Sequence, residues 1–119
     1  MTTQAIADRL VELCRQGKFD EAQDELFSND AVSIEPHATP AFEKETKGLD
    51  AIHEKGRKWF EMVEQMHTME VSDPIVAGNS FACTIHMDVS IKGRGRMDMT
   101  ELCIYEVKDG KITSESFLM

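Results

Sequence analysis

The stretch ELCIYEVKDGKITSESFLM, residues 101–119, holds the side chains of the chain best suited to proton transfer. Glu101 and Tyr105 are separated by three residues with Cys103 midway, so in a β-strand all three side chains project from one face. Apolar residues fill the rest of that face. Burial in such surroundings raises a carboxyl pKa, which suits Glu101 as a general acid or base. The phenol of Tyr105 could donate a hydrogen bond to an oxyanion.

Both residues also have a plainer interpretation. Glu101 could lie at the rim of the face, where its carboxylate would reach water. Tyr105 could pack in the core with its hydroxyl at a wet edge, as tyrosines often do. The sequence leaves the catalytic and the structural interpretation open for each of them.

An apolar ligand site is the second feature that the sequence indicates. Met87, Met99 and Cys103 fall on the same predicted face as Glu101, and Trp59 lies on the apolar stripe of the longest predicted helix. The chain has eight methionines, whose flexible side chains can form an adaptable wall around an apolar molecule. We expect Trp59, Met87, Met99 and Cys103 to bind substrate; the alternative is that they only fill a core.

The hairpin signal Asp109-Gly110 sets the first strand register. A two-residue turn of this type needs positive φ at both positions, which Asp-Gly tolerates well. Unbroken pairing outward from the turn places Tyr105 opposite Ser114, and it puts Glu115 on the other side of the sheet from Glu101. The outer face of the sheet is then expected to carry Leu102, Ile104, Glu106, Thr113, Glu115 and Phe117.

The segment Gly93-Arg94-Gly95 sets the second register. A two-residue loop would put Met87 on the outer face. A three-residue loop, with Gly95 in the left-handed region, places Met87 opposite Glu101 and Ile85 opposite Cys103. We favour the three-residue loop because it gathers the apolar residues on one face, as a buried face requires. That inner face would carry Ile85, Met87, Val89, Ile91, Met97, Met99, Tyr105 and Val107.

The spacing of apolar residues along the whole chain predicts the helices and strands that must hold this sheet in place. Apolar residues recur at helical spacing in three segments and alternate in the later ones, which predicts an α+β domain with an antiparallel sheet. We expect residues 1–119 to form one domain. The predicted helices cover residues 3–16, 20–27 and 48–66, the predicted strands cover 32–35, 67–77, 81–91, 96–107 and 112–118, and residues 36–47 are expected to form a covering loop.

The composition of the chain argues against several classes of partner. The net charge of −9 would repel nucleic acids and anionic lipid surfaces, so we expect neither as a partner. There is no signal peptide or apolar run long enough for a membrane span, and the three cysteines read as reduced thiols, so a cytoplasmic location is expected. No histidine or cysteine spacing matches a metal site, and no cofactor motif occurs; we expect neither metal nor cofactor.

The element order resembles the superfamily of nuclear transport factor 2, ketosteroid isomerase and the SnoaL-like polyketide cyclases. The segments that carry the resemblance are KFDEAQDELFSNDAVSIEP, KGLDAIHEKGRKWFEM and YEVKDGKITSESF, and the SnoaL-like branch is the most similar. The resemblance implies a cone in which the curved sheet wraps around the long helix and encloses a pocket. It also implies a homodimer formed through the outer sheet face, to which Leu102, Ile104 and Phe117 would contribute.

The same resemblance implies a function. Isomerases and cyclases of this type carry an acidic residue on the cavity face, at a position that matches Cys103 here, two residues after Glu101. We therefore expect a small-molecule-binding protein, with Glu101 and Tyr105 as catalytic residues of an isomerase- or cyclase-type enzyme acting on an apolar carbonyl compound. The alternatives are a ligand-binding module without catalysis and a dimeric protein-interaction domain.

Overall fold

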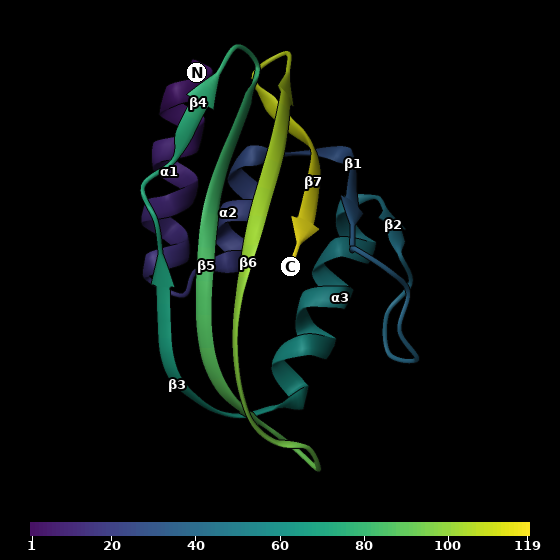
Figure 1. Cartoon of the computed structure of the whole chain (residues 1–119). Helices are drawn as coiled ribbons and strands as arrows, with labels where there is room; N and C mark the ends of the chain where they lie inside the picture. Colours follow the sequence, from purple (N-terminus) through teal and green to yellow (C-terminus); the bar gives the residue numbers. More distant parts are fainter.

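The computed structural model describes residues 1–119 as three helices and seven strands (Figure 1). The helices are α1 (Thr3–Arg15), α2 (Phe19–Leu26) and α3 (Leu49–Met62). The strands are β1 (Phe27–Ile34), β2 (Glu45–Lys47), β3 (Val63–Val71), β4 (Ile75–Ala77), β5 (Ser80–Ile91), β6 (Gly95–Lys108) and β7 (Lys111–Leu118).

All seven strands join one curved sheet that stays open. Their order is β2-β1-β7-β6-β5-β3, with β4 added beside β5. The α+β class and the curved sheet are as predicted; α1 and α2 lie behind the sheet, and α3 lies beside β1 and β2 (Figure 1). The sheet is antiparallel as predicted except at one strand pair, because β1 runs parallel to β7. A parallel pair needs a long connection, and most of the chain lies between these two strands.

Local sequence signals explain where α1 begins and ends. The Thr2 hydroxyl accepts a hydrogen bond from the Ala5 amide at 3.0 Å, which caps the first turn. Gly17 follows the helix with φ of 74°, a left-handed conformation that favours glycine. The buried side of α1 consists of Ile6, Ala7, Leu10, Val11, Leu13 and Cys14.

No helix of the protein is long and apolar enough to cross a membrane.

The long helix is shorter than its apolar period predicts. It ends at Met62 rather than Met66, and β3 begins directly at Val63. Val63 pairs with Ile91 and Met66 with Val89, so backbone pairing along β5 outweighs the helical spacing of these side chains. The predicted covering loop is also not wholly irregular, because Glu45–Lys47 forms β2 at the edge of the sheet, paired with β1.

The β5–β6 pairing puts the predicted residues on the inner face. The three-residue loop is present but consists of residues 92–94, and Gly95, with φ of 83°, pairs with Ile91. Met87 therefore lies opposite Met99, and Glu101 lies opposite Ile85. Each expected partner was wrong by two residues. A shift of two leaves every side chain on its predicted face.

The β6–β7 pairing corrects a more consequential prediction. The turn is as predicted, with φ of 52° at Asp109 and 77° at Gly110. A β-bulge then adds one residue to β7 between Ile112 and Ser114, so Tyr105 pairs with Glu115 instead of Ser114. A shift of one residue reverses the faces, and so both Glu115 and Phe117 lie on the inner face, not the outer one.

Candidate functional site

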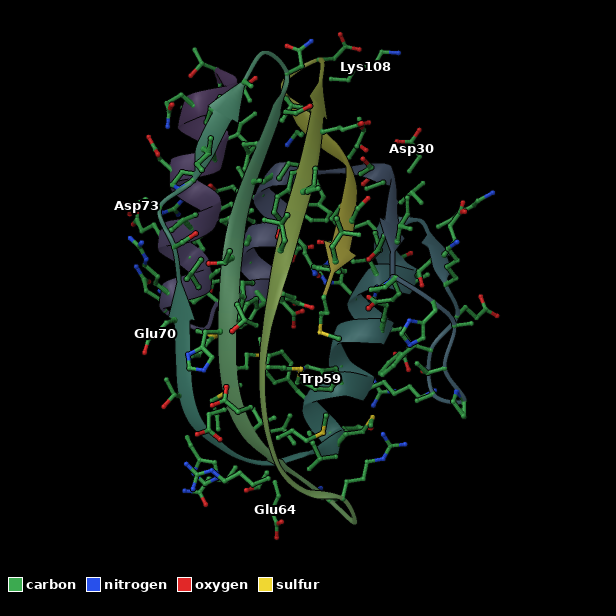
Figure 2. The ribbon with its side chains drawn as sticks, in the orientation of Figure 1. Asp30, Trp59, Glu64, Glu70, Asp73 and Lys108 are labelled. Atoms are coloured by element: carbon green, nitrogen blue, oxygen red, sulfur yellow. The ribbon has the colours of Figure 1, made fainter.

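A cavity of about 250 Å³ lies between the inner face of the sheet and the helices. Of the 21 residues that line it, 15 are hydrophobic, so its walls are mainly apolar. Trp59 lines it from the side of α3 that faces the sheet, whereas the labelled charged residues Asp30, Glu64, Glu70, Asp73 and Lys108 lie around the outside (Figure 2). The charged side chains of the lining are Glu35, Lys55, Glu101 and Glu115.

One row of inner-face residues runs across four strands of the sheet. Ser33 of β1 pairs with Glu115 of β7, which pairs with Tyr105 of β6, which pairs with Phe81 of β5. The Tyr105 and Phe81 rings stack with their centroids 4.8 Å apart. Glu101 lies on the same face of β6, four residues before Tyr105 along the strand. The row therefore places Glu115 beside Tyr105, near the residues predicted from the sequence.

A hydrogen-bonded chain fixes the carboxyl of Glu115. The Ser33 hydroxyl donates to Glu115 Oε1 at 2.8 Å, and Ser33 is fully buried. Lys55 Nζ on α3 donates to Ser33 Oγ at 2.6 Å and to Glu35 Oε2 at 2.7 Å. This ammonium also lies 5.3 Å from the centre of the Phe117 ring, within the range of a cation–π contact. Lys55 thus links helix and sheet and is the single cation among three carboxylates.

Two of these carboxyls titrate near neutral pH. Burial raises the pKa of Glu101 to about 7, and the nearby charges of Glu35 and Glu115 add to the rise while Lys55 opposes it. Burial likewise raises the pKa of Glu115 to about 7, against the opposing effects of the Ser33 hydrogen bond and Lys55. No side-chain hydrogen bond contributes to the pKa of Glu101, so its carboxyl is free to exchange a proton with a bound molecule.

Burial also fixes the protonation of the neighbouring groups. It raises the pKa of the Tyr105 phenol well above its usual value, so this hydroxyl remains a donor at neutral pH. It raises the pKa of the Cys14 thiol to about 12. No three His, Cys, Asp or Glu side chains are grouped so as to hold a metal ion. The carboxyls and the phenol of the cavity can therefore transfer a proton or form hydrogen bonds at neutral pH.

The structure brings most of the predicted site residues together. Glu101, Tyr105, Trp59, Met87 and Met99 all line the cavity. Cys103 does not belong to the lining. It is fully buried opposite Cys83, and a hydrogen bond with that thiol together with burial raises its pKa.

Sequence reasoning missed the other polar residues of the cavity. Lys55 had a usable signal, because it lies three residues after Ile52 and four before Trp59 on the stripe assigned to the core. Glu115 had none, because its position depends on a bulge that no residue type marks. Gln23 of α2 also lines the cavity and was not considered.

Comparisons with known proteins agree with this architecture. The SnoaL-like domain model matches residues 1–119. A crystal structure from Mesorhizobium loti, assigned both as a SnoaL-like polyketide cyclase and as a carbohydrate phosphatase, is 33% identical, with a TM-score of 0.91 over 100% of both chains. A protein of unknown function from Burkholderia pseudomallei, similar to nuclear transport factor 2, gives a TM-score of 0.81 at 11% identity, over 100% of this chain and 92% of that one.

A third solved structure, TerC co-crystallised with polyporic acid, gives a TM-score of 0.78 at 14% identity, covering 99% of this chain and 92% of that one. At this identity the likeness concerns the fold. A search among functionally curated proteins finds no significant match. The full-length match to the domain model and the 33% identity over two whole chains show that this chain belongs to the SnoaL-like family.

Proposed function

We propose that the cavity binds an apolar carbonyl compound and that Glu101 transfers a proton at the carbon beside the carbonyl, as an isomerase- or cyclase-type enzyme does. The observation that carries this proposal is the Glu101 carboxyl itself. This carboxyl lies in a mainly apolar cavity, and its pKa is raised to about 7. No side chain donates a hydrogen bond to it. A general base is most effective when its pKa lies near the working pH.

The reaction follows from the charges of the cavity. Ionised Glu101 removes a proton from the carbon next to the carbonyl, and the electron pair moves to the carbonyl oxygen as an enolate. Tyr105, which remains a phenol, supplies a donor for that oxyanion from the same face of β6. Where a carbon–carbon double bond is conjugated with the enolate, protonated Glu101 then returns its proton to the far carbon of that system, which shifts the double bond. Alternatively the enolate carbon attacks a second carbonyl of the same molecule, and the proton goes to the new alkoxide.

The three carboxylates disfavour one rival activity. The Mesorhizobium loti relative is also assigned as a carbohydrate phosphatase. A phosphate group in this cavity would face Glu35, Glu101 and Glu115 with only Lys55 to offset its charge. The walls are mainly apolar as well, which suits neither a sugar nor a phosphate. We therefore do not extend the phosphatase assignment to this chain.

The remaining alternatives differ in what the cavity does. A protein-interaction domain without a ligand would be expected to fill the cone with side chains, and a cavity of about 250 Å³ speaks against that. A binding module without catalysis keeps the cavity but transfers no proton. TerC, which has the same fold, was co-crystallised with polyporic acid, a precedent for a small organic ligand.

We also propose that the chain forms a homodimer through the outer face of the sheet. Leu102 and Leu118 are paired there and are 37% and 49% exposed, with Ile104 beside them. Phe117 does not contribute, because the bulge turns it inward. A solution mass of two chains at micromolar concentration is expected, and a mass of one chain would contradict this proposal.

Hydrogen–deuterium exchange of a model ketone tests the catalytic proposal. The probe is 2-tetralone, an apolar ketone with exchangeable hydrogens beside its carbonyl, followed by proton NMR in D₂O. We expect the wild type to accelerate exchange over buffer, and Glu101→Gln to lower the catalysed rate by about 100-fold or more, the usual contribution of a positioned acid or base.

The matched control is Glu64→Gln, which removes an exposed carboxylate on β3 outside the cavity (Figure 2). It should leave the exchange rate unchanged. Calorimetric binding of 2-tetralone separates the alternatives. Binding without accelerated exchange would identify a non-catalytic module, and exchange that survives Glu101→Gln would remove Glu101 from the mechanism.

A further inference from the structure

Gly56 lies in the middle of α3, where nothing in the backbone calls for a glycine. The chain has seven glycines, and six of them adopt positive φ, the left-handed region that favours glycine: Gly17, Gly48, Gly78, Gly93, Gly95 and Gly110. Gly56 instead belongs to a regular helix. Inside a helix glycine is less favourable than alanine, because it loses more backbone freedom on folding. The reason for glycine at this position must therefore lie in its surroundings.

Close packing inside the protein does not provide that reason. A glycine often lets another segment approach a helix closely, and a β-carbon added there would collide with that segment. A β-carbon added to Gly56 would meet no atom within 4 Å, apart from its chain neighbours and the backbone of its own helix. Gly56 is nevertheless half-buried rather than exposed. The position that a side chain would take is therefore open space within a wall of the protein.

That open space is part of the cavity. Gly56 lines the cavity, and so do Ile52, one helical turn before it, and Trp59 and Phe60, one turn after it. Residues three and four apart on a helix share one face, so a side chain at position 56 would project into the cavity between these three. Its absence leaves a recess in the α3 wall, which we call the Gly56 recess; Trp59 marks this side of α3 in Figure 2.

The Gly56 recess suits an apolar group. Its three neighbours on the helix are apolar side chains. Ile52 is 1% exposed and Phe60 is 43% exposed, so the recess lies between the buried end and the exposed end of this helix face. At about 250 Å³ the cavity is below the ~300 Å³ at which ligand pockets usually begin. A side chain at position 56 would therefore remove space that a ligand needs.

We propose that Gly56 determines which ligands the cavity accepts, because the apolar part of the bound molecule fills the Gly56 recess and lies against the α3 backbone between Ile52 and Trp59. Broad apolar molecules need this space, whereas small ones fit without it. The inference rests on the part of the proposed function that places an apolar compound in the cavity. It does not depend on proton transfer by Glu101.

Substitution of Gly56 should move stability and binding in opposite directions. Gly56→Ala removes the unfavourable glycine and creates no clash, so we expect its melting temperature to rise by about 2–8 °C. Its affinity for a molecule that fills the recess should nevertheless fall. Gly56→Leu places a larger side chain in the same space. Ala51→Leu is the matched control, because it adds bulk at an exposed position of α3 outside the cavity.

Two hydrocarbons of different size measure the effect on binding. The probes are tetralin and benzene, and the fluorescence of Trp59, the single tryptophan and a neighbour of the recess, reports their binding. Tetralin should bind Gly56→Leu about 10-fold or more weakly than the wild type, with Gly56→Ala in between. Benzene fits a cavity of about 150 Å³, so its affinity should change by less than about 3-fold in every variant. Ala51→Leu should bind both probes as the wild type does.

The inference is overturned if tetralin does not bind the wild type, or if it binds Gly56→Leu as tightly as the wild type. An equal loss of affinity for benzene and tetralin would also overturn it, because the substitution would then have distorted the whole cavity. A melting temperature of Gly56→Ala below that of the wild type would do the same, because the glycine would then have a structural role.

The same variants separate this inference from the proposed function. Binding of tetralin that depends on Gly56, without catalysed exchange of 2-tetralone, would overturn the proton transfer alone. Exchange of 2-tetralone that depends on Glu101 but is as fast in Gly56→Leu as in the wild type would overturn the role of Gly56 alone.

Discussion

The buried carboxyl of Glu115 should make the protein less stable as the pH rises. Its pKa is raised from 4.5 to about 7 in the folded protein. The folded state therefore holds a proton that the unfolded chain has already released between these pH values, and stability falls as the pH rises through this window. The difference of 7 − 4.5 = 2.5 units corresponds to about 3 kcal/mol at 1.36 kcal/mol per unit.

The variant Glu115→Gln isolates this contribution. The amide keeps the size of the side chain and the oxygen that accepts from Ser33, and it carries no charge at any pH. Relative to the wild type, its free energy of unfolding should rise by about 3 kcal/mol from pH 4.5 to pH 8.5. The other charged groups that face Glu115, namely Glu35, Lys55 and Glu101, remain in both proteins, and so most of their own titration cancels in the difference.

Urea denaturation at a series of pH values measures this difference. Glu106→Gln is the matched control, because Glu106 is an exposed glutamate of the neighbouring strand on the outer face. Its stability relative to the wild type should stay constant within about 0.5 kcal/mol. The reasoning would be refuted if Glu115→Gln followed the wild-type pH dependence, or if it were less stable than the wild type at pH 8.5.

Two further substitutions test the neighbours of Glu101. Tyr105→Phe keeps the stacked ring and removes the hydroxyl, so we expect exchange of 2-tetralone to slow about 100–1000-fold with little change in stability. Exchange kinetics and urea denaturation check this together, and an unchanged rate would show that the phenol does not contact the oxyanion. Lys55→Met removes the ammonium that pairs with the partly buried Glu35 carboxylate. It should lower the free energy of unfolding, measured by urea denaturation, by about 1–3 kcal/mol. Lys47→Met, which removes an exposed partner of Glu45, should change stability by less than about 1 kcal/mol, and equal effects of the two lysine variants would contradict the linking role of Lys55.

The face of the sheet that carries Glu101 could be predicted because it rests on strict alternation. Every second residue of β5 is apolar, from Phe81 to Ile91, and only one face of the sheet can accept that row. The predicted face of Met87 was correct although its predicted pairing partner was wrong, since an error of two residues does not change the face. The Asp109-Gly110 turn was equally readable, because few residue pairs suit positive φ at both positions.

The parts that could not be predicted depend on contacts between distant segments. The extra residue in β7 is Thr113, and threonine is common in regular strands. The residue type at this position therefore gives no sign of the bulge that turns Glu115 inward. The end of α3 at Met62 depends on Val63 pairing with Ile91, which the apolar spacing of the helix conceals. The parallel pairing of β1 with β7 joins residues far apart in the sequence, such as Ser33 and Glu115, and no local pattern indicates it.

The pH dependence of ketone exchange tests the central claim most directly. If ionised Glu101 is the base, the rate catalysed by the wild type should rise with pH, reach half its maximum near pH 7 and then level off. In Glu115→Gln the midpoint should move to lower pH, because the charge of Glu115 contributes to the raised pKa of Glu101. A catalysed rate that does not change between pH 5 and pH 9, or a midpoint near 7 that persists in Glu101→Gln, would contradict the account.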